Sequence, residues 1–364
     1  MKRIVAILFA IIILCSLTSC GSESESTTSS NVPSNAPSDE PSIVPSNLTY
    51  FVDEQESRST EPTQVVSDTE VEFTFEILAD SNAKITGYNG TSKDVIIPSV
   101  ISGYTVTSIG KAAFFECSNM TSVTIPDTVT DLEPYAFSYC SNLASVIIPD
   151  SVTNIGLDAF YDCKSLSSVI IGNSVMSIGE GAFFGCSSLA SLTIPDSVTI
   201  IGEQAFFDCS NLASVTIGNS VTTIGTMAFQ WCLLLKSVTF GNSVTTIGES
   251  AFYGCFNLKN VEIPDSVRFI GNRAFDDCRS LTSVTIPNSV TDIGEGAFFD
   301  CSCLTSVTIP DSITTIGDIA FGYHYYEDEG DLQRVKGFII YCYPVSAAER
   351  YAKDNGFAYI LLER

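Results

Sequence analysis

A cysteine returns along this chain at a fixed interval of 23 residues, nine times in succession, as Cys117, Cys140, Cys163, Cys186, Cys209, Cys232, Cys255, Cys278 and Cys301. An Ala-Phe pair follows the same period ten times, from Ala113-Phe114 to Ala320-Phe321. A unit of this length cannot bury an apolar face alone, so its copies must stack on one another. The period therefore predicts a solenoid.

Each repeat contains two short strands joined by a turn. Apolar and polar residues alternate in segments such as SVTIP and SVTTIG, a pattern typical of strands. The turn between them is Pro-Asp or Gly-Asn, and the three glycine copies, Gly172, Gly218 and Gly241, all carry Asn. Pro suits the second position of a type I turn and Gly-Asn tolerates positive φ, so turn chemistry explains the pairing.

A third segment of each repeat follows the column of glycines. In one copy Ala205, Phe206, Cys209 and Leu212 fall at i, i+1, i+4 and i+7. This spacing predicts one face of a helical turn. With neighbouring strands ~4.8 Å apart, ten copies give a body ~48 Å long.

The stretch IGEGAFFGC, residues 178–186, resembles a glycine-rich phosphate loop at first sight. Gly179 belongs to the repeat's glycine column, whereas Gly181 and Gly185 belong to no such column. Its spacing is G-x-G-x-x-x-G, which differs from the G-x-G-x-x-G of a dinucleotide site. We therefore interpret the stretch as one copy of the repeat and not as a nucleotide site.

The N-terminus has the features of an export signal. Lys2 and Arg3 precede an apolar run of about 11 residues, shorter than the ~20 that a spanning helix needs. The run meets LTSC, which resembles the lipobox of bacterial lipoproteins, so residues 1–19 are expected to be a signal peptide and Cys20 a lipid anchor. Acyl chains at Cys20 would hold the protein on a membrane.

Residues 20–70 are predicted to form a disordered tether. They are rich in Ser, Pro and Glu and contain few of the apolar residues that folding requires. The whole chain has a formal net charge of -25. Such an acidic surface repels nucleic acid and anionic lipid, so we expect no nucleic-acid partner.

Both ends of the repeat array need caps, because solenoid ends otherwise expose the core. Residues 71–94 supply an alternating strand with Val71, Phe73, Phe75 and Ile77 on one face. Residues 324–364 are expected to form the other cap, with a short helix that opens on Ser346, where Glu349 completes a capping box, and that Gly356 closes.

The repeat SLTIPDSVTIIGEQAFFDCSNL resembles the BspA-like leucine-rich repeat family, as do the flanks AKITGYNG and FIIYCYPVSAAERYAKDNGFAYI. The resemblance covers about Lys84 to the C-terminus. It implies an α/β fold: a right-handed leucine-rich-repeat solenoid over residues 95–323, with about ten 23-residue repeats, short parallel strands, helical turns and two caps. Family members are typically exported surface proteins, several of them implicated in adhesion to host matrix proteins or to other microbes.

The sequence contains few residues in patterns typical of catalytic or metal sites. The single histidine, His324, has no motif around it and is interpreted as a solvated loop residue. The acidic run Glu327, Asp328, Glu329 and Asp331 lacks calcium-loop spacing. The cysteine column is interpreted as buried free thiols that act as small hydrophobes. We expect no enzyme activity, no metal and no cofactor.

Departures from the repeat consensus mark candidate binding residues, because stacking does not need them. They concentrate in the sixth to eighth repeats and give the candidate partner-binding patch Trp231, Leu233, Lys236, Phe256, Lys259, Arg268 and Phe269. Aromatic and Arg residues are frequent interface anchors. The alternative is drift in a tolerant repeat, and the patch can also be divided between two faces.

The sequence favours a monomeric, lipid-anchored cell-surface solenoid that binds a protein partner. Two alternatives stay open. A structural spacer or envelope component would need no dedicated ligand. A glycan-binding module would show several exposed aromatics in line on one face, and the sequence offers few outside the predicted helical ladder.

Overall fold

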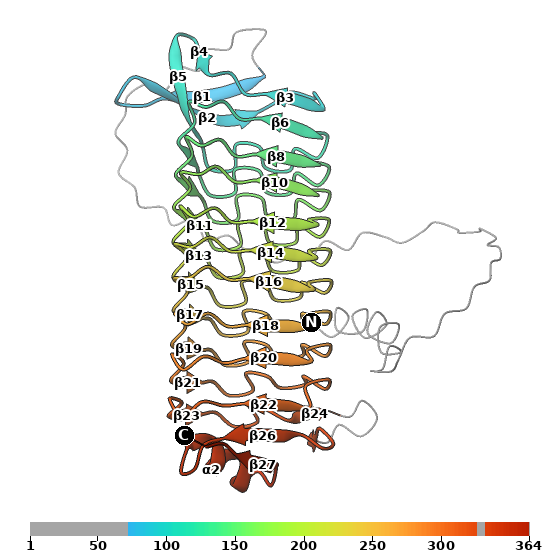
Figure 1. Cartoon of the computed structure of the whole chain (residues 1–364). Coiled ribbons are helices and arrows are strands. Elements are labelled where there is room, and N and C mark those ends of the chain that lie inside the picture. The colour runs from blue at the N-terminus through green and yellow to red at the C-terminus, as the bar shows by residue number, and fades with distance from the viewer. Residues whose placement is uncertain (1–71, 326–331, 364) are drawn as a thin grey trace, which may run out of the picture. The chain divides into compact units, whose positions relative to one another are not determined.

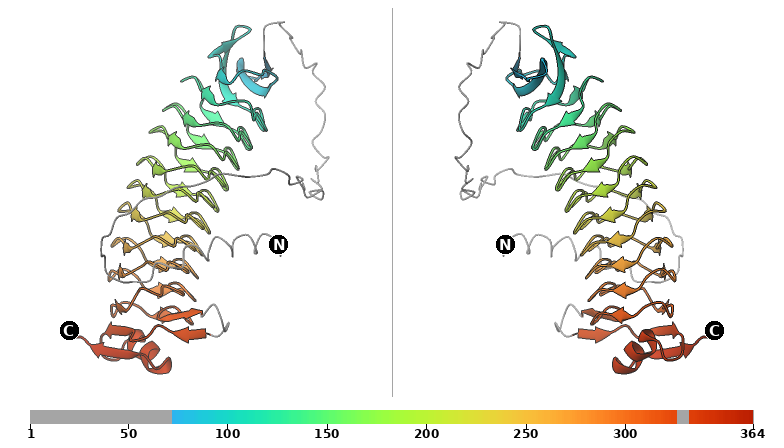
Figure 2. Two further views of the ribbon diagram at one scale, coloured as in Figure 1. Left: turned by 90° about the vertical axis from the view of Figure 1, so that its right-hand side faces the viewer. Right: turned by 90° about the vertical axis from the view of Figure 1, so that its left-hand side faces the viewer.

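The computed structural model describes residues 72–325 and 332–363, and the fold is stated for these. Within them the chain winds into a stack of coils, each about one repeat long (Figure 1), and the stack is curved in the side views of Figure 2. Each coil passes through two strand positions and one run of turns. Equivalent residues of neighbouring coils therefore lie side by side, 23 residues apart, as Ile178 and Ile201 do.

One strand position forms a continuous sheet, here called the long sheet. Its strands pair in parallel from β2 through β5 to β23, with β1 and β4 added antiparallel. The members are β1 (Phe73–Ile77), β2 (Asn82–Tyr88), β4 (Val100–Ile101), β5 (Tyr104–Ile109), β7 (Asp131–Leu132), β9 (Asn154–Ile155), β11 (Ser177–Ile178), β13 (Ile200–Ile201), β15 (Thr223–Ile224), β17 (Thr246–Ile247), β19 (Phe269–Ile270), β21 (Asp292–Ile293) and β23 (Thr315–Ile316).

The other strand position forms the segmented face, which Figure 1 shows as the column of arrows from β3 to β27. Among the described residues it divides into four pairing groups, with breaks after β10, β16 and β20. The members are β3 (Asp94–Ile96), β6 (Ser122–Thr124), β8 (Ser145–Ile147), β10 (Ser168–Ile170), β12 (Ser191–Thr193), β14 (Ser214–Thr216), β16 (Ser237–Thr239), β18 (Asn260–Glu262), β20 (Ser283–Thr285), β22 (Ser306–Thr308), β26 (Ile339–Cys342) and β27 (Ala358–Leu361). The two predicted strands per repeat are thus confirmed.

The third side of the coil is here called the turn face. A helical turn was predicted there, and the structure has a different conformation. Residues 202–212 form turns and no helix. Gln204 and Asp208 have φ of 53°, a left-handed conformation that an α-helix does not contain. Backbone N–H groups instead alternate between the next coil, as Phe206 N to Ala228 O at 2.8 Å, and their own coil, as Cys209 N to Phe206 O at 3.3 Å. The apolar spacing correctly predicted which side chains are buried, but its prediction of a helix is wrong.

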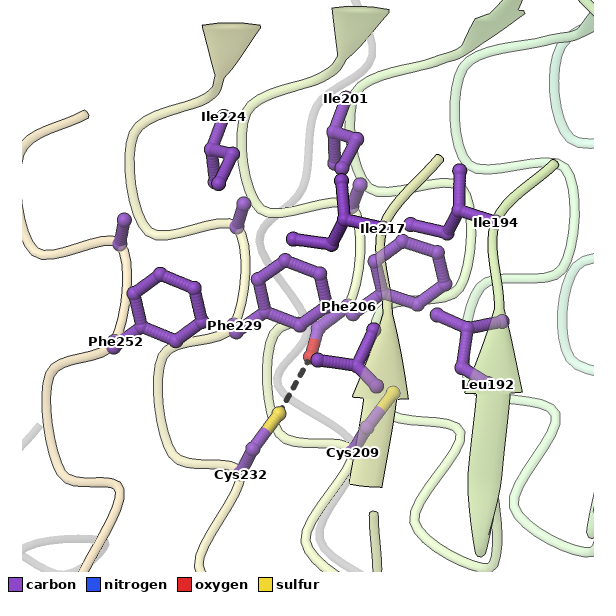
Figure 3. Close-up of a cluster of buried hydrophobic side chains, with 14 of the residues drawn as sticks. Leu192, Ile194, Ile201, Phe206, Cys209, Ile217, Ile224, Phe229, Cys232 and Phe252 are labelled. Carbon is purple, nitrogen blue, oxygen red and sulfur yellow. Dashed lines mark hydrogen bonds between the residues drawn. The ribbon is translucent and has the colours of Figure 1, made fainter. Parts of the chain in front are cut away.

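The buried ladder of ten phenylalanines, from Phe114 to Phe321, runs along the axis of the stack. Successive ring centroids lie 4.8–5.3 Å apart, with interplanar angles of 3–15°. Figure 3 shows Phe206, Phe229 and Phe252 beside isoleucines from both strand sides of the coil. All ten are buried, and each aromatic pair adds about 0.5–1.5 kcal/mol beyond the burial of apolar area. The core is therefore one continuous column.

The structure changes the interpretation of two sets of glycines, those in the turns between the strands and those on the turn face. A Cβ on Gly172, Gly218 or Gly241 would overlap the carbonyl of the proline or glycine in the preceding coil, and none of the three has positive φ. These glycines therefore permit close approach of backbones. Conversely, Gly181 and Gly185 do belong to columns, with φ of 58° and 69°, which they share with residues such as Gln204 and Asp208. The columns conserve a backbone conformation while the residue type varies.

Additional elements cover the two ends of the stack. At the start, β1 pairs with β2, and Tyr88 stacks on Phe114 at 5.5 Å. At the other end lie the hairpin β24 (Tyr323–Tyr325) with β25 (Leu332–Arg334) and the helix α2 (Ala347–Asp354). Tyr351 of α2 donates its hydroxyl to the carbonyl of Phe321 at 3.0 Å, closing the phenylalanine ladder.

The predicted N-cap of the C-terminal helix is confirmed, but the reciprocal bond of the capping box goes to the residue before the N-cap. Ser346 is the N-cap and accepts a hydrogen bond from Glu349 N at 3.1 Å, and the Glu349 carboxylate accepts one from Val345 N. Gly356, with φ of 66°, follows the C-cap. None of the described helices has the length and apolarity to cross a bilayer.

Candidate partner-binding surfaces

The structure divides the predicted patch between different sides of the solenoid. Leu233 and Phe256 occupy equivalent positions on neighbouring coils, just after the buried cysteines. Asn257 donates its amide N–H to the carbonyl of Leu233 at 2.7 Å. The Arg279 guanidinium, in the next coil, lies 5.4 Å from the centroid of the Phe256 ring. These residues form one stacked column at the edge of the turn face.

Two lysines extend that column towards the segmented face. Lys236 and Lys259 are both exposed and also occupy equivalent positions on neighbouring coils, just before β16 and β18. We call Trp231, Leu233, Lys236, Phe256 and Lys259 the corner cluster. On each of two coils an exposed lysine follows an apolar residue by three positions, a combination that suits a partner with apolar and acidic residues.

Arg268 and Phe269 do not join the corner cluster. Phe269 lies in β19 of the long sheet, with its side chain 44% exposed. Arg268 donates to the carbonyl of Ser289 at 3.2 Å. Strand pairing places Phe269 beside Thr246 and Asp292, all in the long sheet. The seven predicted residues therefore lie on two sides of the coil, which is the division that the sequence left open.

Trp231 packs on the turn face and has a specific backbone requirement. Its φ is 61°, its N–H donates to Tyr253 O at 2.8 Å, and its ring lies 5.3 Å from that of Phe207. Positive φ is uncommon for a bulky residue. Surrounding contacts hold this half-buried side chain in place.

A groove on the segmented face was missed by the sequence reasoning. Ile147 and Ile170 are 62% and 56% exposed, and Ile96 at the equivalent place in β3 is 73% exposed. Ile147 and Ile170 line an open groove of about 790 Å³, together with Ile148, Ile171 and the turn residues of three coils. We call this the isoleucine groove. Its signal was present in the sequence, because Thr stands at this outward place in β6, β12, β14, β16, β20 and β22.

Carboxylates mark one edge of the isoleucine groove. Asp127 and Asp150 belong to the Pro-Asp turns that line it. Asp150 accepts a hydrogen bond from Asn173 N at 2.6 Å, which joins two turns of neighbouring coils. The groove therefore combines an apolar floor with an acidic edge, and it can hold an apolar side chain beside a basic one.

The cysteine column has a hydrogen-bonding role. From Cys140 to Cys301 each thiol donates to the carbonyl of the phenylalanine in the preceding coil, over 3.1–3.4 Å, as Figure 3 shows for Cys232 and Phe206. These eight side chains are buried, as predicted, while Cys117 is half-buried. Burial raises the pKa of Cys117 to about 11 and the pKa of Cys209 further above its usual value. The column is therefore held as protonated thiols.

Two other predicted features are placed differently. His324 lies in strand β24, opposite Gln333 of β25, and is partly buried, so its interpretation as a solvated loop residue is wrong. The acidic run at 327–331 lies outside the described residues. Within the described part of the chain, no group of three or more His, Cys, Asp or Glu side chains is arranged to hold a metal.

An aromatic row lies on the turn face, within the segment that the sequence assigned to the helical ladder. Six rings follow one another on six coils: Phe115, Tyr139, Tyr161, Phe184, Phe207 and Trp231. Phe115 and Tyr139 are about 40% exposed, and the other four are partly buried. We call this row the aromatic track.

The coils and their surfaces define a class of protein: a parallel β-solenoid built from tandem repeats, whose variable side chains point outward from a uniform core. Residues 92–213 and 199–327 match the family described as the BspA type leucine-rich repeat region. The chain therefore belongs to the BspA-type leucine-rich repeat family, a repeat scaffold, and the predicted resemblance is confirmed.

The chain is also similar to solved structures. A leucine-rich repeat protein from Bacteroides ovatus is 31% identical, with a TM-score of 0.63 over 75% of this chain and 70% of that one. A leucine-rich cell surface protein from Faecalibacterium prausnitzii is 28% identical, with a TM-score of 0.45 over 84% of this chain and 96% of that one. A search of the curated proteins finds no significant match.

Proposed function

We propose that this chain is a lipid-anchored cell-surface solenoid that binds a protein partner by surface complementarity, without catalysis, in adhesion to host matrix proteins or other cells. Residues 1–19 act as the export signal, Cys20 carries the lipid, and residues 20–70 hold the folded part away from the membrane. The lipobox-like LTSC and the BspA-type repeats support this proposal.

The observation that carries the proposal is the isoleucine groove. Thr satisfies the outward strand position in six other coils, so Ile is not needed there for stacking. Exposing Ile147 and Ile170 to water is unfavourable, and apolar patches rimmed by polar residues are typical of interaction sites. The corner cluster is a second candidate surface.

The test uses variants that restore the chain's own consensus, because these leave stacking unchanged. One variant carries Ile147→Thr and Ile170→Thr, and a second carries Leu233→Ser, Lys236→Ala and Lys259→Ala. Each is compared with the parent mature chain, with Cys20→Ser in place of the lipid site, for binding to purified extracellular-matrix proteins, bacterial cells and glycans. Thermal unfolding is recorded for each protein.

Loss of one specific partner in the groove variant, with an unchanged melting temperature, supports the groove as the binding site. If only the corner variant loses binding to the partner, the binding site is the corner cluster. If the parent binds no member of the panel, the spacer interpretation replaces protein binding. Membrane extraction with and without Cys20→Ser tests the anchor, since the variant should leave the membrane fraction.

A further inference from the structure

The aromatic track is a second stack of rings, parallel to the buried phenylalanine ladder and nearer the solvent. Its five successive ring-to-ring separations are 4.6–5.4 Å. The buried ladder already fills the core, so the fold does not need this second stack. Further along, the equivalent place holds Tyr253, Asp276 and Phe299, so the fold also tolerates a residue without a ring there.

The track is continuous because two rings shift by one position along the chain. Where the column of Tyr161 and Phe207 contains Ser138 and Gln230, the next residues, Tyr139 and Trp231, supply the rings instead. Both have φ near 60°, and in neighbouring coils their position is filled by residues such as Asp162. In these two coils the aromatic residue stands one position later than in the others, and the row of rings therefore continues without a gap.

Ring orientation determines what the track offers to a ligand. Tyr161, Phe184 and Phe207 stack within 6–11° of parallel at 4.6–4.7 Å, so their faces cover one another and their edges point outward. Tyr139 is tilted by 53° from Tyr161, and Trp231 by 51° from Phe207. Because these two rings are not parallel to their neighbours, the stack leaves parts of their faces uncovered, and aromatic faces attract cations. The parallel rings between them form an apolar strip.

Carboxylates lie beside this apolar strip. Asp162 follows Tyr161 directly and Asp208 follows Phe207, while Asp158 belongs to the same coil as Tyr161. Lys164 pairs with Asp162 at 3.1 Å. Partial burial and the neighbouring charge of Glu180 raise the pKa of Asp158 to about 6, and burial with the charge of Asp162 raises the pKa of Asp208. Carboxylates so placed gain from an approaching positive charge.

We propose that the aromatic track binds an extended basic segment of a partner polypeptide. Lys or Arg side chains of the segment lie over the tilted rings of Tyr139 and Trp231 and pair with the flanking aspartates. Apolar side chains of the segment cover the ring edges between them. The proposal rests on the proposed role in protein binding and names the chemistry of the partner, but it does not require the isoleucine groove.

Two other occupants fit the same observations less well. A glycan would stack its sugar rings on aromatic faces, and the three central rings of the track present edges. The chain's own Pro-rich segment, residues 21–46, contains Glu23, Glu25, Asp39 and Glu40 and would meet like charges at the track. Charge complementarity therefore favours a basic polypeptide.

The test is a titration of the mature chain, with Cys20→Ser, by a labelled peptide of about twelve alternating Arg and Pro residues, which stays extended at roughly 3.1 Å per residue and so outspans the track. A peptide of alternating Glu and Pro and a soluble β-linked oligosaccharide are titrated in parallel. The expected result is saturable binding of the Arg-Pro peptide, weakened as salt rises from ~50 to ~500 mM.

Two variants locate the site. Tyr139→Asn with Trp231→Asn removes the tilted rings without changing net charge, and Asn tolerates the positive φ at both places; we expect affinity to fall at least about fivefold. Asp158→Asn with Asp162→Asn and Asp208→Asn should lower it about tenfold. The matched control, Glu262→Gln with Asp265→Asn and Glu295→Gln, removes as many exposed charges elsewhere and should change affinity less than about twofold.

The outcomes separate this proposal from the previous one. Equal loss in the control and the aspartate variant, or no loss in the aromatic variant, overturns it, since net charge then explains binding. Preferential binding of the oligosaccharide overturns it in favour of a glycan site. Ile147→Thr with Ile170→Thr should leave peptide binding unchanged, so failure of the groove and failure of the track are distinguishable.

Discussion

Replacing Cys209 with alanine tests the role of the cysteine column. The thiol is fully buried and donates to the Phe183 carbonyl at 3.3 Å. That carbonyl also accepts from Cys186 N at 3.2 Å, so it keeps a partner after the substitution. The loss is therefore the burial of one sulfur atom and the small void that it leaves. Together these cost about 1–2 kcal/mol.

Serine at the same place should cost at least as much as alanine. Its hydroxyl is more strongly hydrated than a thiol, and its shorter C–O bond places the donor further from the Phe183 carbonyl. Burying a hydroxyl with a poor partner costs about 1–3 kcal/mol. Cys209→Ser is thus the sharper comparison, since it retains a donor while it removes the sulfur.

The assay is urea unfolding of the mature chain with Cys20→Ser, followed by far-ultraviolet circular dichroism, under reducing conditions. The midpoint should decrease in the order parent, Cys209→Ala, Cys209→Ser. If the serine variant equals or exceeds the parent, the thiol is not acting as a small hydrophobe, and the account of the column given above is wrong.

Four further predictions follow from named contacts. Gly225→Ala places a Cβ 2.6 Å from the carbonyl carbon of Gly202, so unfolding should become easier by about 1–3 kcal/mol in the same urea assay. Ser346→Ala removes the acceptor for Glu349 N and should cost about 1 kcal/mol, seen as faster amide exchange in α2; unchanged exchange would contradict the cap. Burial raises the pKa of Asp276 to about 8, so the folded state binds this proton more tightly and stability should fall as pH rises from about 4 to 8; Asp276→Asn should flatten that slope. Iodoacetamide should modify Cys117 before Cys209, because Cys117 is half-buried and Cys209 is buried, and peptide mapping that shows the reverse order would refute the burial argument.

The period of 23 residues was enough to predict the solenoid, the paired strands and the buried ladders, because stacking forces equivalent residues into contact. It was not enough for the turn face. The spacing of Ala205, Phe206, Cys209 and Leu212 fits a helix, but φ of 53° at Gln204 and Asp208 excludes one. A backbone conformation that recurs at one position of every repeat cannot be recognised from the sequence when the residue type at that position varies.

The candidate surfaces were predicted in part for a related reason. Departures from consensus identified Leu233, Phe256, Lys236 and Lys259, which the structure places on neighbouring coils. The same method missed Ile147. An apolar residue in a strand is normally assigned to the core, and only the structure shows that this side chain points to the solvent. The method also missed the aromatic track, because two of its rings stand one position away from their column.

The breaks in the segmented face give the solenoid a preferred direction of bending. Each break lies between a turn with Asn and a following turn with Pro-Asp, as between Asn173 and Pro195, whereas the long sheet is hydrogen-bonded throughout. Hydrogen bonds resist extension along the axis, so the segmented face is the more compliant side. Tension on the molecule should open these three joints first, and curvature should change about them while the long sheet keeps its length. Under load the solenoid would therefore bend about its hydrogen-bonded side, the long sheet.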